Sequence, residues 1–254
     1  MISLIPLSDN NPTHRFPIVT VALIAANILA FFFVEPGFGE SAEASKYFFE
    51  NAPVPCQVTD ECPTGEACLT SDCSVTTSIP ERGLVSFLGA ILLSTFLHGG
   101  FLHIAGNMLF LWVFGNNVED FLGRFKYLLF YLAGGVVAAL AHIVTHLDSF
   151  APTIGASGAV AAVMGAYLLL YPRARVNVLV PIIILFTVIQ LSAFAVLGLW
   201  FLYQFLIGAQ EAAGATQVAW MAHVGGFVFG VVAIFLLGGR PHHPRPVWQP
   251  TWRY

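Results

Sequence analysis

Six apolar segments separated by polar connections predict six membrane-spanning helices. They are Ile18–Val34, Leu102–Val118, Tyr127–His146, Ser157–Tyr171, Val176–Ile207 and Ala219–Leu237. A crossing helix needs about 20 apolar residues, so Ser157–Tyr171 is short for a crossing and Val176–Ile207 is long enough to tilt or to carry a bent end. A further apolar segment, Leu84–Leu97, is expected to lie in or dip into the membrane interface. The pattern therefore predicts an all-α polytopic membrane protein with a bundle of six transmembrane helices.

The polar segments divide the chain into parts. We expect a cytoplasmic N-terminal segment at residues 1–17, a six-span domain at 18–238 and a cytoplasmic proline-rich tail at 239–254. Residues 35–83 form a cysteine-bearing insertion in the first loop, and nine of the fourteen Asp and Glu residues lie there. The first apolar run lacks the small-residue cleavage site of a signal peptide, so we expect it to be retained as a span.

The basic residues indicate the orientation in the membrane. Six spans put both termini on one side, and Lys and Arg collect in cytoplasmic loops. Only Lys46 and Arg82 fall on the side opposite the termini. Eight basic residues fall on the side of the termini: Arg15, Arg124, Lys126, Arg173, Arg175, Arg240, Arg245 and Arg253. We therefore expect an integral membrane protein with both termini in the cytoplasm and the cysteine-rich loop outside.

Composition supports the membrane interpretation and excludes nucleic acid as a partner. The 254 residues are 57% hydrophobic and only 9% charged, whereas soluble domains carry about 25% charged residues. The formal net charge is −4, and no basic patch is available to neutralise phosphates.

The four cysteines lie together in the polar first loop. Cys56, Cys62, Cys68 and Cys73 fall within VPCQVTDECPTGEACLTSDC. Their spacing lacks the C-x₂-C pairs of common zinc sites, so we favour two disulfides over a metal knot. Four cysteines allow three pairings, and the pairing stays open. Disulfides would place the loop in an oxidising compartment.

The first candidate for chemistry is a serine at the start of the short fourth span, in GASG. Such a serine most often caps a helix or packs against a neighbour. Gly155 and Gly158 flank Ser157 and suit a tight turn that leaves the hydroxyl unshielded. His223, in WMAHVGGFVFG of the sixth span, is either a buried residue bonded to a carbonyl or a base for that hydroxyl.

Small residues predict that these two spans approach closely. His223, Gly226 and Gly230 share one helix face, and Ser157, Ala161 and Gly165 share another. Side chains this small let helices pack tightly, which would bring the serine hydroxyl near the imidazole. A third candidate region is HGGFLHIAGN, where His103 and Asn107 lie one helical turn apart. They either bond neighbouring helices or stabilise an oxyanion beside the backbone N–H of Ser157, and His98 at the loop junction can support either role.

The remaining polar positions suggest no further chemistry. A catalytic triad needs a carboxylate, but none lies within a span, and Asp148 and Glu211 in the connections are not obvious partners. We therefore expect a Ser–His dyad. His142 and His146 lack the glutamate of the zinc-protease motif, so no metal and no cofactor are expected. Three isolated polar residues are interpreted as contacts between helices: Asn27, Gln190 and Gln204.

With HGGFLHIAGN, GASG and AHVGG in this order, the chain resembles the rhomboid family of intramembrane serine proteases, and YPRARV is similar to bacterial members. The similarity to bacterial members implies a bacterial cytoplasmic (inner) membrane as the location. The resemblance covers about Phe16 to Leu237. It implies a six-helix core in which Ser157 is the nucleophile and His223 the general base. It also implies an oxyanion hole formed by His103, Asn107 and the Ser157 backbone N–H, and a turn shaped by Gly155. The implied substrates are single-span membrane proteins in the lipid bilayer.

Three departures from the family concern substrate handling more than chemistry. The first loop has no Trp-Arg pair, and the cysteine segment is an insertion. Ala161 stands where some members place a tyrosine that stacks on the histidine, so the orientation of His223 must come from elsewhere. The leading hypothesis is an intramembrane serine endopeptidase that forms an acyl-enzyme. The alternatives are a non-catalytic rhomboid-like protein that binds membrane proteins and a polytopic transporter.

Overall fold

A computed structural model describes residues 5–39, 41–59, 62, 67–69, 76–182, 185–212 and 218–240. The α-helices are α1 (Ile18–Phe33), α2 (Ala42–Asn51), α3 (Leu84–Ser94), α4 (Phe101–Leu122), α5 (Arg124–Thr145), α6 (Ser157–Leu170), α7 (Ala193–Ala212) and α8 (Trp220–Leu236). Short 3₁₀ helices are η1 (Pro36–Gly39) and η2 (Pro55–Val58). The strands are β1 (Ile5–Asp9), β2 (Ala67–Cys68), β3 (Thr76–Thr77), β4 (Arg175–Ile182) and β5 (Leu185–Ser192).

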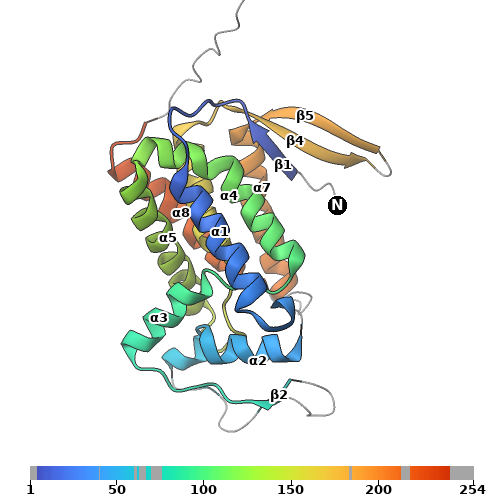
Figure 1. Ribbon diagram of the computed structural model, residues 1–254, viewed down its shortest axis with the longest axis vertical. Coiled ribbons are helices and arrows are strands. Elements are labelled where there is room, and N and C mark those ends of the chain that lie inside the picture. The colour runs from blue at the N-terminus through green and yellow to red at the C-terminus, as the bar shows by residue number, and fades with distance from the viewer. Residues whose placement is uncertain are drawn as a thin grey trace, which may run out of the picture.

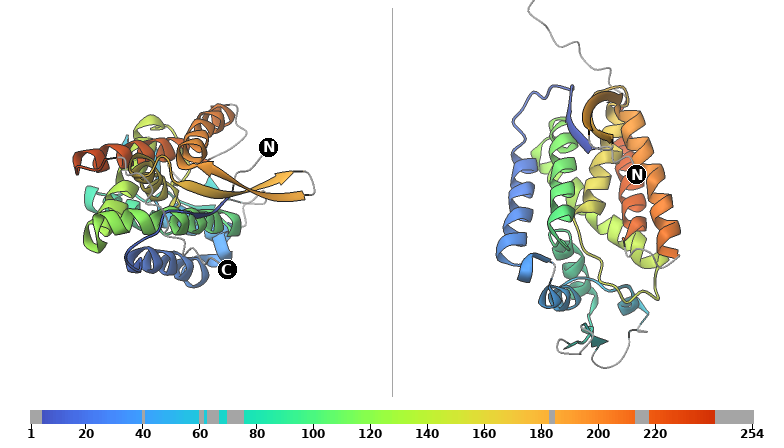
Figure 2. Two further views of the ribbon diagram at one scale, coloured as in Figure 1. Left: turned by 90° about the horizontal axis from the view of Figure 1, so that it is seen from above. Right: turned by 90° about the vertical axis from the view of Figure 1, so that its right-hand side faces the viewer.

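The longer helices form a bundle with shorter elements at its two ends. Helices α1 and α4 to α8 run side by side along the long axis, α2 and α3 lie at one end, and the β1–β4–β5 sheet lies at the other (Figures 1 and 2). Helix α6 is at the centre and packs against α4, α5 and α8. Every residue from Gly158 to Tyr167 is buried, which explains why this segment consists of small and apolar residues.

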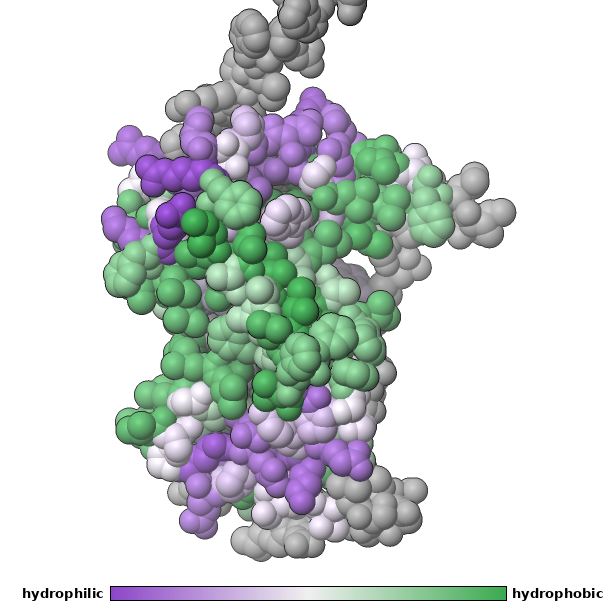
Figure 3. Space-filling model, in the orientation of Figure 1, coloured by the Kyte–Doolittle hydropathy of each residue, from purple (hydrophilic) through white to green (hydrophobic). Residues whose placement is uncertain are grey.

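The helices carry the hydrophobic surface expected of a membrane protein. Among the residues that the structure describes, two segments are both long and apolar enough to cross a membrane, Arg124–Thr145 of α5 and Ala193–Glu211 of α7. Shorter apolar helices are α1, α3, α6 and α8. On the face drawn in Figure 3, a hydrophobic belt covers the middle of the bundle and hydrophilic residues cover both ends. The protein is thus a mostly helical bundle with an apolar belt.

The prediction of an all-α fold is wrong at residues 175–192. This stretch, expected to begin a helix over Val176–Ile207, forms the antiparallel hairpin β4–β5, which projects from the bundle (Figure 2), and α7 begins only at Ala193. Val176, Val178 and Val180 alternate in burial with their neighbours, which is the period of a strand. β-branched side chains also favour strands.

The N-terminal segment is part of this sheet. Strand β1 pairs antiparallel with β4, so that Ile5 lies opposite Leu179. The segment is also tied to the bundle, because Asn117 of α4 donates to Asp9 (2.9 Å) and the Tyr167 hydroxyl of α6 donates to the same carboxylate. Residues 5–9 therefore fold onto the helical domain.

The loop between α1 and α3 contains a disulfide. Cys56 and Cys62 are bonded, with their Cα atoms 4.9 Å apart. This agrees with the expectation of disulfides in the loop and fixes one pairing. The N–H of Cys56 donates to the Ser149 carbonyl beyond α5, which ties η2 to the bundle. Cys73, the Cys68 side chain and the proline-rich tail from residue 241 lie outside the described residues.

Candidate active site

The turn before α6 positions Ser157 as the first residue of that helix. Gly155 adopts a φ of +120°, which is accessible to glycine and strained for other residues. Its N–H donates to the Ser94 carbonyl at the end of α3 (2.9 Å). The chain can therefore turn sharply and still be anchored, and Ser157 begins α6 with its hydroxyl at the floor of a cavity.

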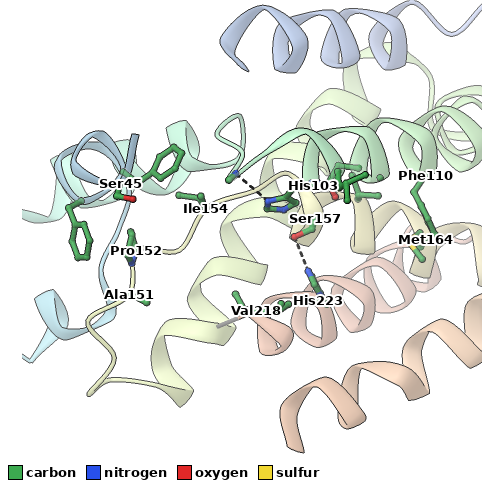
Figure 4. Close-up of a pocket in the computed structure, with 18 of the residues that line it drawn as sticks. Ser45, His103, Phe110, Ala151, Pro152, Ile154, Ser157, Met164, Val218 and His223 are labelled. Carbon is green, nitrogen blue, oxygen red and sulfur yellow. Dashed lines mark hydrogen bonds between the residues drawn. The ribbon is translucent and has the colours of Figure 1, made fainter. Parts of the chain in front are cut away.

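The Ser157 hydroxyl and the His223 imidazole are in hydrogen-bond contact. Ser157 Oγ lies 2.8 Å from Nε2 of His223, which comes from the first turn of α8 (Figure 4). The two residues are 66 positions apart in sequence. This contact can deprotonate the hydroxyl if Nε2 is the unprotonated nitrogen of a neutral imidazole.

Glycines allow α6 and α8 to approach closely enough for this contact. A Cβ built on Gly226 would lie 2.1 Å from the Gly158 carbonyl oxygen, and one on Gly230 would lie 1.9 Å from that of Ala162. From the other side, a Cβ on Gly165 would meet the Phe227 carbonyl oxygen at 2.1 Å. The two backbones are thus in direct contact. Ala161 and Gly165 of the predicted small-residue face are also buried in α6.

The other ring nitrogen of His223 is hydrogen-bonded to Gln204, which the sequence suggested only as a contact between helices. Gln204 Oε1 of α7 lies 2.7 Å from His223 Nδ1. Gln204 Nε2 donates to the Trp200 carbonyl one turn earlier (3.0 Å). The sequence contained a usable signal, because an amide within an apolar span is costly unless it has a specific partner. It did not show which helix supplies that partner.

His103 and Asn107 of α4 line the same cavity as Ser157 and His223. The Asn107 side-chain nitrogen is buried and has no hydrogen-bond partner among the described residues. The N–H of Gly99 is directed at His103 Nδ1 (3.4 Å), which leaves Nε2 to carry the proton. A Cβ built on Gly155 would lie 2.8 Å from that Nε2 and 3.5 Å from Ser157 Oγ. The glycine thus keeps open a space between two potential donors and the serine.

The loop before α4 is held by buried polar groups. Both carboxylate oxygens of Glu35 accept the backbone N–H of His98 (3.0 and 3.1 Å). Burial raises the pKa of Glu35 to about 7, and the bond from His98 opposes that rise. His98 is fully buried, and its ring packs edge-on against that of His103. Burial, with a smaller effect of His103, lowers the pKa of His98 to about 3, so His98 is a neutral support for His103.

Ser157, His223, His103 and Asn107 line a cavity of about 900 Å³. Figure 4 shows His103 and His223 on either side of Ser157, and Phe110 and Met164 further along the cavity. The wall near α2 contains Ser45, Phe48 and Phe49. The cavity is therefore a mostly apolar space with a few polar groups gathered at the serine, which is the usual composition of a small binding site.

The histidine pair and the Glu211 carboxylate that the sequence analysis set aside contact each other instead. The His142 and His146 rings stack at 4.4 Å, and His146 Nε2 lies 3.3 Å from the Glu211 carboxylate. Glu211 is therefore paired away from the dyad. Within the described ranges, no cluster of three or more His, Cys, Asp or Glu residues could hold a metal ion.

Curated proteins with similar sequences include three informative relatives. The chain is 32% identical over 148 residues to "Presenilin-associated rhomboid-like protein A, mitochondrial" of Danio rerio, which covers 56% of this chain and 35% of that protein. It is 28% identical over 162 residues to "Rhomboid protein 1, mitochondrial" of Saccharomyces cerevisiae, covering 60% and 42%. It is 43% identical over 72 residues to "Rhomboid protease GluP" of Bacillus subtilis, covering 28% and 14%.

These matches correct one prediction and limit what can be transferred. The chain spans less than half the length of each of these relatives. The expected bacterial cytoplasmic membrane is wrong on this comparison, because the matches that cover most of this chain are to proteins with mitochondrial names. Basic residues indicate a side of a membrane but do not identify the membrane.

The family itself follows from a longer match. The family model of the Rhomboid domain matches residues 87–240, which include α4 to α8 and all the residues around Ser157 and His223. This is more than half of the sequence, and the chain belongs to the rhomboid family.

Proposed function

We propose that this chain is an intramembrane serine protease that cleaves membrane proteins through a Ser157–His223 dyad. The observation that carries the proposal is the 2.8 Å contact between Ser157 Oγ and His223 Nε2 at the floor of the cavity. An unactivated serine hydroxyl is a weak nucleophile, and a histidine in this position is the usual activating base. The name of the Bacillus subtilis relative, a rhomboid protease, supports the same activity.

The proposed reaction uses each of these groups in turn. Ser157 Oγ attacks the scissile carbonyl carbon, and its proton passes to His223 Nε2. When the tetrahedral intermediate collapses, the C–N bond breaks and the imidazolium gives that proton to the leaving amine. His223 then deprotonates a water molecule, which attacks the acyl-enzyme and releases the carboxylic acid and the free Ser157 hydroxyl. This is the sequence of steps established for serine hydrolases in general.

The negative charge of the tetrahedral intermediate needs hydrogen-bond donors. Three donors are proposed: the Asn107 amide nitrogen, which has no partner among the described residues, His103 Nε2 and the backbone N–H of Ser157. The N–H groups of the first turn of a helix have no partner within that helix, so the start of α6 is suited to this role. Donors already held in an apolar cavity stabilise such a charge strongly, because they need no reorganisation during the reaction.

We also propose that α1 and α4 to α8 are the six spans of the domain. They lie parallel in one bundle, and α2, α3 and the disulfide gather at one end (Figure 1). At the other end lie β1, β4, β5 and the connection from α4 to α5. The described basic residues divide accordingly. Lys46 and Arg82 lie at the end that holds α2 and α3. The others lie at the end that holds the sheet: Arg15, Arg124, Lys126, Arg173, Arg175 and Arg240. The names of two relatives support a mitochondrial membrane as the location.

The decisive experiment compares Ser157→Ala and His223→Ala with the unaltered protein on a single-span reporter in proteoliposomes. Both variants should lose cleavage entirely, and fluorophosphonate should label Ser157 only when His223 is present. Ser86→Ala and His14→Ala are matched controls, because both side chains are exposed and lie away from the cavity. Cleavage by Ser157→Ala would refute the mechanism. Reporter binding by the unaltered protein, with neither cleavage nor labelling, would favour the non-catalytic alternative.

A further inference from the structure

Gln204 occupies an unusual position for a polar residue of α7. It is 1% exposed, although Leu199, Leu202 and Phe205 on the same helix are exposed on the outside of the bundle. A buried amide without partners is unfavourable, so its bonds should explain why it is there. Both ends of the amide have a partner, and one of them is the proposed catalytic base.

The two bonds fix the orientation of the amide. Its nitrogen donates to the Trp200 carbonyl at 3.0 Å, and a carbonyl can only accept. The oxygen of the amide therefore faces His223 Nδ1, at 2.7 Å. Because an amide oxygen can only accept, Nδ1 must carry a proton. In a neutral imidazole the other nitrogen, Nε2, is then unprotonated and faces the Ser157 hydroxyl.

We propose that Gln204 is the positioning residue that holds His223 in the Nδ1–H tautomer, the role that a carboxylate has in a catalytic triad. This inference rests on the proposed protease function and adds a third helix, α7, to the dyad of α6 and α8. A 180° flip of the ring would place the Cε1–H group opposite the serine, and transfer of the proton to Nε2 would place an N–H there; neither group can act as a base. The 2.7 Å bond opposes both.

Other groups around His223 do not supply this function. Glu211, the acidic residue of α7, is paired with His146. The Trp200 ring lies 5.8 Å from the imidazole at an angle of 45°, so it packs beside the ring and does not bond to a nitrogen. Ala161 has no ring to stack on the histidine. A neutral amide also orients the imidazole without placing an ion in an apolar interior, where an ion would be costly.

The test combines cleavage kinetics with ¹⁵N NMR of the histidine ring. Gln204→Met keeps the size of the side chain but removes the acceptor, and Gln204→Glu keeps an acceptor opposite Nδ1. The matched control is Gln210→Met, since Gln210 is on the same helix but exposed. A His223→Gln sample assigns the His223 signals. All proteins are measured as full chains in the same detergent, and thermal unfolding reports whether each variant is folded.

The expected result is a change in catalysis and in tautomer together. Gln204→Met should lower kcat by about 10- to 100-fold, which is less than the roughly 10²- to 10⁴-fold that a positioned base contributes because the base itself remains, and should leave KM within about twofold. Its His223 spectrum should change from the Nδ1–H form to a mixture, whereas Gln204→Glu and Gln210→Met should keep the Nδ1–H form. A Gln204→Met protein with unchanged kcat, or with a pure Nδ1–H tautomer, would overturn the proposal.

The NMR measurement separates this inference from the proposed function. If the unaltered protein cleaves no reporter and takes up no fluorophosphonate, the proposed protease function fails. The tautomer of His223 in the unaltered protein and in Gln204→Met then still decides whether Gln204 holds the ring. If the unaltered protein is active and Gln204→Met is equally active, only the inference about Gln204 fails.

Discussion

Replacing Gly226 by alanine is expected to push α8 away from α6 and to stretch the contact between Ser157 and His223. The added Cβ would lie 2.1 Å from the Gly158 carbonyl oxygen, 3.1 Å from the Gly158 carbonyl carbon and 3.3 Å from the Ala138 Cβ. Two of these atoms belong to the backbone, which cannot rotate away as a side chain can. Gly158 also directly follows the nucleophile, so the strain arises beside the dyad.

The size of the displacement follows from the contact distances. Ordinary contacts of a Cβ begin at 3.4 Å, so the difference from 2.1 Å requires the backbones to separate by about 1.3 Å. Ser157 Oγ and His223 Nε2 are 2.8 Å apart. Most of this shift, added to that distance, is enough to remove the hydrogen bond between them. A misplacement of about 1 Å can lower a catalytic rate by about 10²-fold. Overpacking should also cost about 1–3 kcal/mol of stability.

The assay is the initial rate of reporter cleavage in proteoliposomes, with fluorophosphonate labelling of Ser157 as a second readout that needs no substrate. Thermal unfolding in detergent measures the loss of stability separately. Gly198→Ala is the matched control, because a Cβ there would meet no atom within 4 Å, and it should keep the rate and the stability. A folded Gly226→Ala protein whose cleavage and labelling rates stay within twofold would refute the reasoning.

Three further predictions concern other parts of the protein. Asn107→Ala should slow cleavage by about 10²- to 10³-fold without lowering the unfolding temperature, because its amide nitrogen has no partner to lose among the described residues; a large drop in that temperature would show a structural role instead. Reducing the Cys56–Cys62 bond, which closes a short loop, should cost about 2 kcal/mol in the loop-entropy account. Unreduced, denatured protein in which both thiols are alkylated would contradict the disulfide. Glu35→Gln should make unfolding more acid-sensitive between pH 7 and 5. As the pH falls, protonation stabilises the fold through Glu35, whose pKa is raised to about 7, and destabilises it through His98, whose pKa is lowered to about 3. The variant keeps only the destabilising effect, and parallel unfolding profiles of the two proteins would refute this.

The helical segments could be predicted closely from the sequence. Ile18–Val34 was expected where α1 covers Ile18–Phe33, and Ser157–Tyr171 where α6 covers Ser157–Leu170. These limits are reliable because a long apolar run ends where polar residues begin. The hairpin at 175–192 was missed because its apolar residues continue into α7 without a polar break. Its alternating valines were a signal of a strand. Of the two strands that pair with β4, only β5 is close in sequence; β1 lies about 170 residues away, beyond any local pattern.

The candidate site could be predicted only in part. The close approach of Ser157 and His223 could be anticipated because small residues on two helices indicate which faces meet. Gln204 could not be assigned in this way. Gln204, Gly208 and Ala212 share one face of its helix, but periodicity shows the faces of one helix without showing which other helix each one meets. The pairing of Gln204 with His223 depends on how α7 is placed against α8, which only the structure reveals.

The geometry divides the support of His223 into a distance and a tautomer that serve the same proton transfer, and a double variant tests whether they do. The distance from His223 to Ser157 is set by glycine contacts between α6 and α8, whereas the tautomer is set by Gln204 on α7. Gly226→Ala should therefore keep the Nδ1–H form in the NMR spectrum while it slows cleavage, and Gln204→Met should change that form. Both changes disable the same proton transfer, and effects of groups that act as a unit are not additive. The double variant should be no slower than the slower single variant; a loss equal to the product of the two single losses would mean that Gln204 acts on a different step from the transfer between Ser157 and His223.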